Sequence, residues 1–290
     1  MVKLLDDDDW DMILDQINEG KCTPFLGAGA SQPYLPLGGD IAERWVEEYK
    51  CPLPGCRDLP RVAQFLAVRK NPMFPKNQIV REFFSNMKLP DFDQQDEPHG
   101  ILADLPLPIY VTTNYDHFMF HALSKRHKNP KLEVCRWNTI LQKEKSIFDE
   151  KFEPNSENPV VFHLHGHFEN AQSLVLTEDD YLYFLVNLEK DEKKLVPSPI
   201  VKAFTGSSLL FLGYSLSDWD FRVLFQGIVM GMEKSLREFS ISVQLPPGEE
   251  QMVNYWEKYL GDNGVKISWG TAREFAAELN RRWKEYQTKR

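Results

Sequence analysis

The sequence predicts an α/β protein: a Rossmann-like, mainly parallel sheet with helices on both faces and a helical insert. Short runs of apolar and β-branched residues recur along the 290 residues, and amphipathic helical patterns separate them. Strands of this kind, buried on both faces, are typical of parallel sheets. Because hydrophobic residues make up 42% of the chain, we expect one domain over residues 1–290, with the insert at 40–106.

The N-terminal part begins with a helix and a buried strand. Apolar residues at helical spacing predict a helix over 10–17, and residues 22–26 form a short apolar run that enters a glycine-rich turn. Three amphipathic patterns follow, near 40–49, 60–70 and 76–87. Prolines divide this region into short pieces, so we interpret it as a helical insert rather than as sheet.

The rest of the chain supplies the other strands and helices. Further strands are predicted at 107–113, 132–136, 160–164, 209–212, 239–243 and 265–269. Helices are predicted over 115–127 and from 217 to about 232, and the stretch 142–158 is expected to be a surface loop. Two more helices begin with a threonine followed by an acidic residue three positions later, at Thr177/Asp180 and Thr271/Glu274.

Charge and composition exclude several classes of function. The 43 acidic residues outnumber the 34 Lys and Arg, which leaves a net charge of −9, so we expect no direct binding to nucleic acid. We find neither a signal peptide nor an apolar run of ~18 residues that could span a membrane. The four cysteines lack the spacing of a zinc site. We therefore expect a reduced, cytoplasmic protein without a metal.

Polar and glycine residues follow four of the predicted strands, where parallel sheets bind their ligands. The segments are Gly27-Ala28-Gly29-Ala30-Ser31, Thr113-Asn114-Tyr115-Asp116, His163-Leu164-His165-Gly166-His167 and Gly213-Tyr214-Ser215-Leu216-Ser217-Asp218. Glycines allow a backbone to approach a pyrophosphate, although the third glycine of the usual dinucleotide motif is missing. The combination of four such strand ends is more specific than any one of them.

That combination resembles the sirtuin family, and in particular its bacterial sirtuin-like NADase branch. The segment 27–31 is similar to the family's glycine-rich cofactor loop, and Asn114 with Asp116 is similar to its Asn-x-Asp motif. His165-Gly166 matches the catalytic His-Gly, and the Gly213–Ser215 segment matches the Gly-x-Ser that meets the cofactor ribose. The resemblance implies that NAD binds to residues 27–31, Thr113, Asn114, Asp116, Gly213, Ser215 and Asp218.

Departures from the family pattern indicate which activity to expect. Deacetylating sirtuins hold a structural zinc with two cysteine pairs beyond the His-Gly motif, but here no cysteine follows Cys135. That zinc module forms one wall of the acyl-lysine groove, so its absence disfavours protein deacylation. The resemblance therefore implies an NAD glycohydrolase, an antiviral defence effector that depletes NAD.

The resemblance also implies roles for three catalytic residues. Cleaving the nicotinamide–ribose bond builds positive charge on the sugar, and nicotinamide leaves as a neutral group. Asn114 is expected to place a water molecule, and His165 to accept its proton at cytoplasmic pH. Asp116 is expected to orient Asn114, to bind the ribose, or to help set the strand end.

Plainer interpretations stay open beside this one. A lone buried histidine is more often a hydrogen-bonded core residue than a base. His163 and His167 are expected on the same strand face as His165, so the three could instead bind a metal. The whole chain could also be an NAD- or nucleotide-binding regulatory module without turnover, or, less favoured, a deacylase.

The resemblance implies partners as well. Compact chains of this branch are paired in some systems with a HerA-type ATPase, and an NADase needs restraint in its own cell. We find no obvious sensor domain here, so we expect regulation through a homo-oligomer or through such a partner. The segment 40–87 is a candidate contact surface because it is rich in aromatic residues: Trp45, Tyr49, Phe65, Phe83 and Phe84.

Overall fold

The predicted α/β class is confirmed: the core is a seven-stranded sheet in which every strand pair is parallel. The computed structural model describes residues 5–216 and 238–289 of the chain. The strand order is β3-β4-β2-β1-β5-β6-β7. The strands are β1 (Cys22–Leu26), β2 (Ile109–Thr112), β3 (Lys131–Val134), β4 (Val160–His163), β5 (Ser208–Leu212), β6 (Ser240–Gln244) and β7 (Val265–Trp269).

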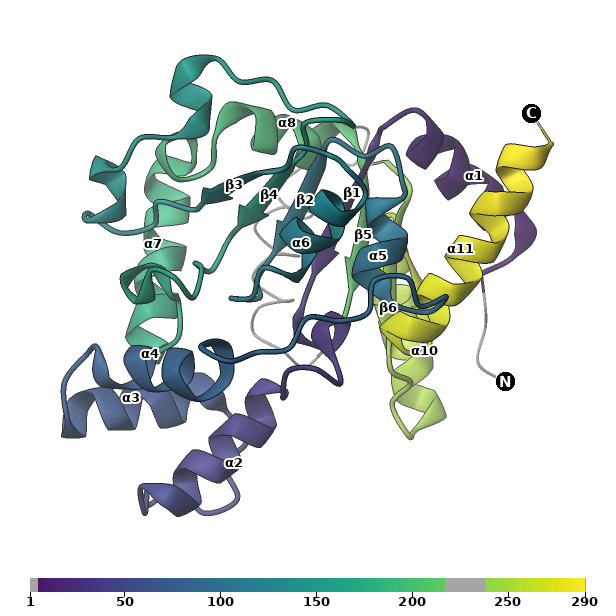
Figure 1. Ribbon diagram of the computed structural model, residues 1–290. Helices are drawn as coiled ribbons and strands as arrows, with labels where there is room; N and C mark the ends of the chain where they lie inside the picture. Colours follow the sequence, from purple (N-terminus) through teal and green to yellow (C-terminus); the bar gives the residue numbers. More distant parts are fainter. Residues whose placement is uncertain (1–4, 217–237, 290) are drawn as a thin grey trace.

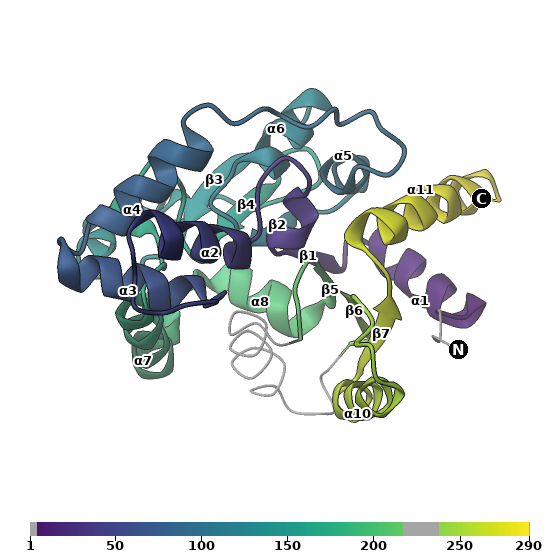
Figure 2. The same ribbon diagram turned by 90° about the horizontal axis from the view of Figure 1, so that it is seen from below.

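Helices cover both faces of this sheet (Figures 1 and 2). One face is covered by α1 (Asp7–Asn18), α5 (Pro98–Ala103), α6 (Phe118–Lys125) and α11 (Ala272–Thr288). The other is covered by α7 (Glu178–Leu195), α8 (Ser198–Gly206) and α10 (Glu250–Gly261). The helices α2 (Gly38–Glu48), α3 (Leu59–Arg69) and α4 (Phe74–Ile79) lie together at one end of the molecule, away from α1 and α11.

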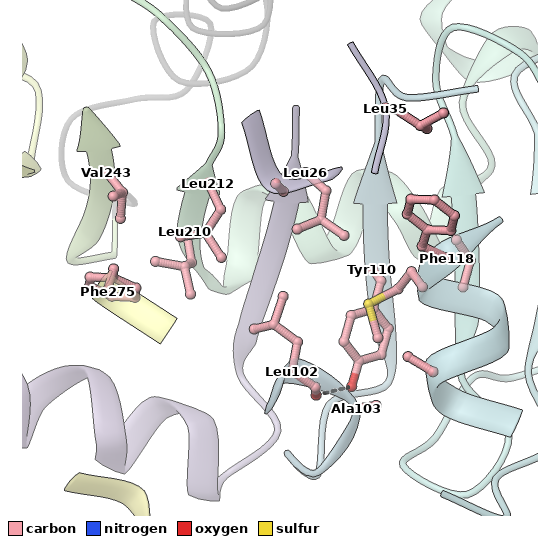
Figure 3. Packing of buried hydrophobic residues seen from close by; sticks show 14 of the residues in the cluster. Leu26, Leu35, Leu102, Ala103, Tyr110, Phe118, Leu210, Leu212, Val243 and Phe275 are labelled. Atoms are coloured by element: carbon pink, nitrogen blue, oxygen red, sulfur yellow. Dashed lines mark hydrogen bonds between the residues drawn. The ribbon is translucent and has the colours of Figure 1, made fainter. Parts of the chain in front are cut away.

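Successive side chains of the central strands point to opposite faces, and both faces are covered. Leu210 and Leu212 of β5 point into the cluster beneath α1 and α11, while Leu209 and Phe211 point into the cluster beneath α8. All five residues of β5 and of β1 are buried. Figure 3 shows the first cluster, in which Leu210 and Leu212 lie beside Leu26 and Val243. This two-sided burial is why the strands appear in the sequence as continuous apolar runs.

Helix caps predicted from the sequence are confirmed. The Thr271 side chain accepts a hydrogen bond from the Glu274 amide, and the Glu274 carboxylate accepts one from the Thr271 amide, which fixes the start of α11. Thr177 and Asp180 exchange the same two bonds at the start of α7. Capping boxes of this kind satisfy amides that the first helical turn leaves without partners.

Several helix expectations were incomplete. The helix predicted over 115–127 begins only at Phe118, because the Asp116 carboxylate accepts the Phe118 amide and holds the preceding residues in a turn. The helix expected over 76–87 is two short pieces, α4 and a π-helical turn over Val80–Phe84. Helices α5, α8 and α10 were not predicted, and the helix expected from 217 to about 232 lies outside the described residues.

The aromatic residues of the 40–87 segment do not form an exposed patch. Trp45 and Phe84 are buried, and Tyr49, Phe65 and Phe83 pack partly buried against the core. We expected some of these aromatic side chains to remain exposed as a contact surface. That expectation is wrong, because these side chains pack α2, α3 and the π-helical turn against the core. No helix within residues 5–216 and 238–289 has both the length and the apolar composition to cross a membrane.

The buried Tyr110 hydroxyl provides a test of this packing. Its oxygen donates to the Leu102 carbonyl at 3.0 Å, which ties β2 to the end of α5 (Figure 3). Tyr110→Phe removes this hydrogen bond but leaves the carbonyl with the Leu105 amide at 3.2 Å, so we expect the free energy of unfolding to fall by about 1 kcal/mol. Denaturant unfolding measures this change. Tyr255→Phe, at a 53% exposed position, is the matched control, and an equal loss in both variants would contradict the assignment.

Candidate active site

The carboxyl ends of β1 and β5 lie in direct backbone contact. The Gly29 amide donates to the Gly213 carbonyl at 2.8 Å. A Cβ atom on Gly27 would lie 2.8 Å from the Gly213 oxygen, and one on Gly213, whose φ is +79°, would lie 2.2 Å from the Ala30 nitrogen. Only glycine fits such positions. The glycine-rich loop and the Gly-Tyr-Ser segment, far apart in the sequence, therefore form one surface.

The rim of this surface is open. Ala28 and Ser215 are exposed, and Gly29 is half-buried, whereas Ser31 beneath them is buried. A ligand can therefore reach the backbone at the ends of β1 and β5. Asp218, predicted to contact the cofactor, lies outside the described residues.

The Asn114 side chain is held in one orientation from the end of β2. Its Nδ2 donates to the Gly27 carbonyl at 2.9 Å and to the Ser31 hydroxyl oxygen at 3.0 Å. A carbonyl can only accept, so the group that faces it must be the amide nitrogen. The carbonyl oxygen Oδ1 consequently has no donor within the described part of the chain and is left for a water molecule or a ligand.

Asp116 lies behind Asn114 rather than at the surface. Its Oδ2 accepts the Ser31 hydroxyl proton at 2.8 Å, and its Oδ1 accepts the Phe118 amide at 2.9 Å. Burial raises the pKa of this carboxyl group, while hydrogen bonds and nearby positive charge oppose the rise. Of the three roles left open by the sequence, this geometry favours orientation of Asn114, through Ser31.

Thr113 and Tyr214 are engaged in holding the strand ends together. The Thr113 hydroxyl donates to the Tyr214 oxygen at 3.2 Å, and the Tyr214 hydroxyl donates to the Leu26 carbonyl at 3.1 Å. Both side chains are buried. Thr113, predicted to bind the cofactor, thus has its hydroxyl committed inside the protein, and Tyr214 joins the ends of β1, β2 and β5.

His165 follows β4, next to β2 in the sheet. Its ring is 1% exposed and packs edge-on against Tyr181 and Phe184 of α7, with ring centroids 5.4 and 5.2 Å away. Gly166 turns the chain here with a φ of +91°, and a Cβ on it would lie 2.2 Å from the Ser173 carbonyl oxygen. The structure does not bring His165 into hydrogen-bond contact with Asn114.

The idea that His163, His165 and His167 share one face is wrong. The strand ends at His163, the chain turns at Leu164 and His165, and the His165 ring packs against α7. The rings of His163 and His167 lie 4.7 Å apart, on the other side, with His117 5.8 Å from His167. Within the described ranges no group of three His, Cys, Asp or Glu side chains is placed to hold a metal ion.

The three rings of this second group, which we call the histidine cluster (His117, His163 and His167), are neutral. Burial lowers the pKa of His117 and His163 to about 4 and that of His167 to about 3, and the neighbouring imidazoles lower them further. His163 donates from Nδ1 to the Asn114 carbonyl at 3.1 Å. The Nε2 atoms of His163 and His167 are buried without a hydrogen-bond partner. The cluster therefore holds the Asn114 backbone through the hydrogen bond of His163.

A cavity of about 410 Å³ lies beside the glycine-rich loop and was not predicted. It opens between that loop and the start of α11, and its lining residues are Gly29, Gln32, Pro33, Tyr34, Gln94, Thr271, Ala272 and Arg273. These side chains come from three distant parts of the sequence, so no local pattern could have joined them. Arg273 is held there by Asp96, at 2.7 Å between Nη2 and Oδ1.

Comparisons with known proteins agree with this arrangement. Residues 108–262 match the family model described as "SIR2-like domain". The chain is 30% identical over 224 residues to NAD(+) hydrolase ThsA of Cytobacillus dafuensis, covering 76% of this chain and 41% of that protein. It is 28% identical over 213 residues to NAD(+) hydrolase ThsA of Enterococcus faecium, covering 70% and 39%. The chain thus spans about two fifths of the length of these relatives.

A solved structure was also found to be similar. It is described as "Structural Basis for the Mechanism and Regulation of Sir2 Enzymes", and it aligns with a TM-score of 0.47 at 12% sequence identity. The alignment covers 98% of this chain and 100% of that one.

The neutral histidine cluster predicts a loss of stability in acid. Unfolded, each ring has a pKa near 6.5; folded, the values are about 4, 4 and 3. The contribution of these rings to stability is therefore fully present above pH 6.5 and falls as the pH drops toward 4. In that range the unfolded chain binds protons at these rings and the folded chain does not. We expect the two most buried rings, His163 and His167, to contribute a slope of about 2–3 kcal/mol per pH unit, and the more solvated His117 to add less.

Denaturant unfolding at pH 7.5, 6.0 and 5.0 measures this slope. His163→Asn should flatten it, whereas His127→Asn, at an exposed position, should not change it. Equal slopes in the parent and in His163→Asn would show that the cluster does not determine the acid sensitivity.

Proposed function

The chain belongs to the SIR2-like domain family, and on this premise we propose that it is an NAD⁺ hydrolase that cleaves the nicotinamide–ribose bond. The two relatives described above carry the name NAD(+) hydrolase, and their similarity extends over more than two thirds of this chain. NAD is the substrate in this proposal, and no step requires a metal.

The orientation of Asn114 is the observation on which the proposal depends. Its amide nitrogen is fixed by Gly27 and Ser31, so its carbonyl oxygen is available beside the glycine-rich loop. The Gly27, Gly29 and Ala30 amides donate inside the protein, so a bound nucleotide would meet the loop at exposed Ala28, beside exposed Ser215. A water molecule that donates a hydrogen bond to the Asn114 side-chain carbonyl would then lie next to the anomeric carbon of the bound nucleotide.

The chemistry balances with one water molecule and one base. The bond from the anomeric carbon to the nicotinamide nitrogen breaks, and its electron pair leaves with neutral nicotinamide. The water oxygen bonds to the same carbon, which gives ADP-ribose, and the proton it releases passes to His165. Because the ring of His165 is 1% exposed beneath Tyr181 and Phe184, this step requires the start of α7 to shift when NAD binds.

We further propose the cellular role of an antiviral defence effector that depletes NAD in the cytoplasm. An unrestrained NADase would exhaust its host, so its active state must be rarely populated until it is triggered. We propose that this restraint comes from a homo-oligomer and from a partner protein, a HerA-type ATPase being the candidate. The outer side of α7 is a suitable contact surface, since Leu182, Tyr183 and Val186 are 62, 45 and 44% exposed.

Asn114→Ala and His165→Ala test the catalytic assignment. Removing a water-orienting group or a base typically costs ~10²–10⁴ in rate, so we expect each variant to lose that much NAD hydrolysis while remaining folded. Nicotinamide release from purified protein, with and without the partner and with no acylated peptide present, measures turnover. Circular dichroism and melting establish that the variants are folded.

The controls are Asn129→Ala and His127→Asn, at exposed positions that precede β3 and so lie away from the carboxyl ends of the strands. Near-parental turnover in both test variants would refute the site. Strict dependence of nicotinamide release on an acetyl-lysine peptide would instead restore the deacylase, and NAD binding without any release would favour a regulatory module.

Assembly provides a separate prediction. We expect light scattering to show a homo-oligomer at working concentration, and Leu182→Lys to reduce its mass because a charge cannot be desolvated cheaply in an apolar contact. Met12→Lys, on α1 and 49% exposed, is the matched control. A monomer that is fully active and indifferent to added HerA-type ATPase would contradict the regulatory proposal.

A further inference from the structure

A buried ion pair lies at the start of α5, in a region the catalytic proposal does not use. The Glu97 carboxylate contacts the His99 ring, with Oε1 and Nδ1 2.7 Å apart, and each side chain is 1% exposed. The other carboxylate oxygen, Oε2, accepts the Gly100 amide at 2.6 Å. Both oxygens of Glu97 are therefore occupied, and the pair is rigidly attached to the helix start.

The short contact favours the charged form of each partner. Burial is the largest single influence and opposes both charges, but the hydrogen bond and the opposite charge outweigh it. The pKa of Glu97 is thereby lowered and the pKa of His99 raised. Arg273 of α11 is the other cation in the field of Glu97, and its guanidinium is already paired with Asp96. The imidazolium of His99 is thus the cation that Glu97 holds.

One residue, Phe118, connects the pair to Asp116. His99 packs edge-on against Phe118 with ring centroids 5.6 Å apart, and the Phe118 amide donates to Asp116. The positive charge of His99 lowers the pKa of Asp116, in opposition to burial, which raises it more. His99 thus supplies a positive charge that acts on a buried carboxyl group.

We propose that His99, held by Glu97, is a positioning residue for the hydrolase site: it keeps Asp116 a hydrogen-bond acceptor and so fixes the Asn114 amide. This inference rests on the proposed function for its catalytic consequence, though not for its structural part. Neither residue touches the reacting atoms.

The charge of Asp116 decides the direction of the two hydrogen bonds that Ser31 makes. A charged Asp116 can only accept, so the single hydroxyl proton of Ser31 goes to it, and the Ser31 oxygen is left to accept from Asn114 Nδ2. If Asp116 were protonated, it could donate to Ser31, and the hydroxyl of Ser31 could turn toward Asn114. The amide would then lose one of its two restraints, and its carbonyl oxygen would no longer point reliably at the substrate water.

Local sequence explains why α5 holds the pair so closely. Pro98 occupies the first turn, where its missing amide costs no hydrogen bond. A Cβ on Gly100 would lie 2.0 Å from the Phe92 carbonyl oxygen, so the helix start approaches the preceding loop more closely than any other residue would permit. The Glu-Pro-His-Gly segment thus places one ion pair rather than merely beginning a helix.

The first experiment reads the charge directly. Nitrogen-15 signals of the seven histidine rings in the parent protein should include one ring that becomes neutral at a higher pH than a free imidazole does, and Glu97→Gln should remove that difference. A parent protein in which no ring does so would overturn the proposal without reference to activity. This measurement on the parent remains decisive if Glu97→Gln folds poorly.

The second experiment reads the position. In Glu97→Gln we expect the acid limb of kcat/KM for nicotinamide release to move up by about one pH unit, with kcat about 10-fold lower at pH 6, and the Asn114 side-chain amide protons to exchange faster. Glu133→Gln, at a buried carboxylate on β3, is the matched control and should change neither. An unchanged pH profile in a turning-over Glu97→Gln enzyme would overturn the positioning role.

The two proposals can fail separately. If the parent releases no nicotinamide under any condition, the hydrolase proposal fails, and the Asn114 amide exchange alone decides the inference. Faster exchange in Glu97→Gln than in Glu133→Gln then supports it, and equal exchange overturns it.

Discussion

The contact between two glycine-bearing backbones determines the rest of this site. Because Gly27 and Gly213 lack side chains, the ends of β1 and β5 can approach until the Gly29 amide bonds the Gly213 carbonyl. That approach leaves the Gly27 carbonyl where Asn114 can donate to it, and it brings the Tyr214 ring across the end of β1. A methyl group at either position would separate the strand ends and remove the surface on which Asn114 is oriented.

Much of the fold could be predicted because its strands and caps leave local marks in the sequence. The strand at 22–26 and the strand at 265–269 appear at the predicted bounds, and the Thr271 capping box opens the last helix. Short helices such as α5 were missed because Pro98 and Gly100 suggest a turn when tertiary packing is unknown.

The site could be predicted only in part, for reasons of the same kind. Asn114 and the glycine loop follow strands that are neighbours in the sheet, so the position of each in the sequence was sufficient. The face of His165 was mistaken, because the strand ends at His163 and the chain turns at Leu164 and His165, which ends the alternation that a continuing strand would have kept. The role of the Glu97–His99 pair could not be predicted from the sequence, since it depends on Asp116, which only the folded chain brings near the pair.

Two kinds of buried histidine lie near Asn114: neutral rings such as His163, and His99, which is paired with Glu97. Acid acts on them differently. His163 remains neutral and uses Nδ1 to hold the Asn114 carbonyl, so a proton added in acid enters at Nε2 and leaves that bond intact. The bond that holds the Asn114 backbone therefore persists in acid for as long as the chain stays folded. Acid reaches the Asn114 side chain by another route, through protonation of Asp116, so the backbone and the side chain of one residue respond to pH separately.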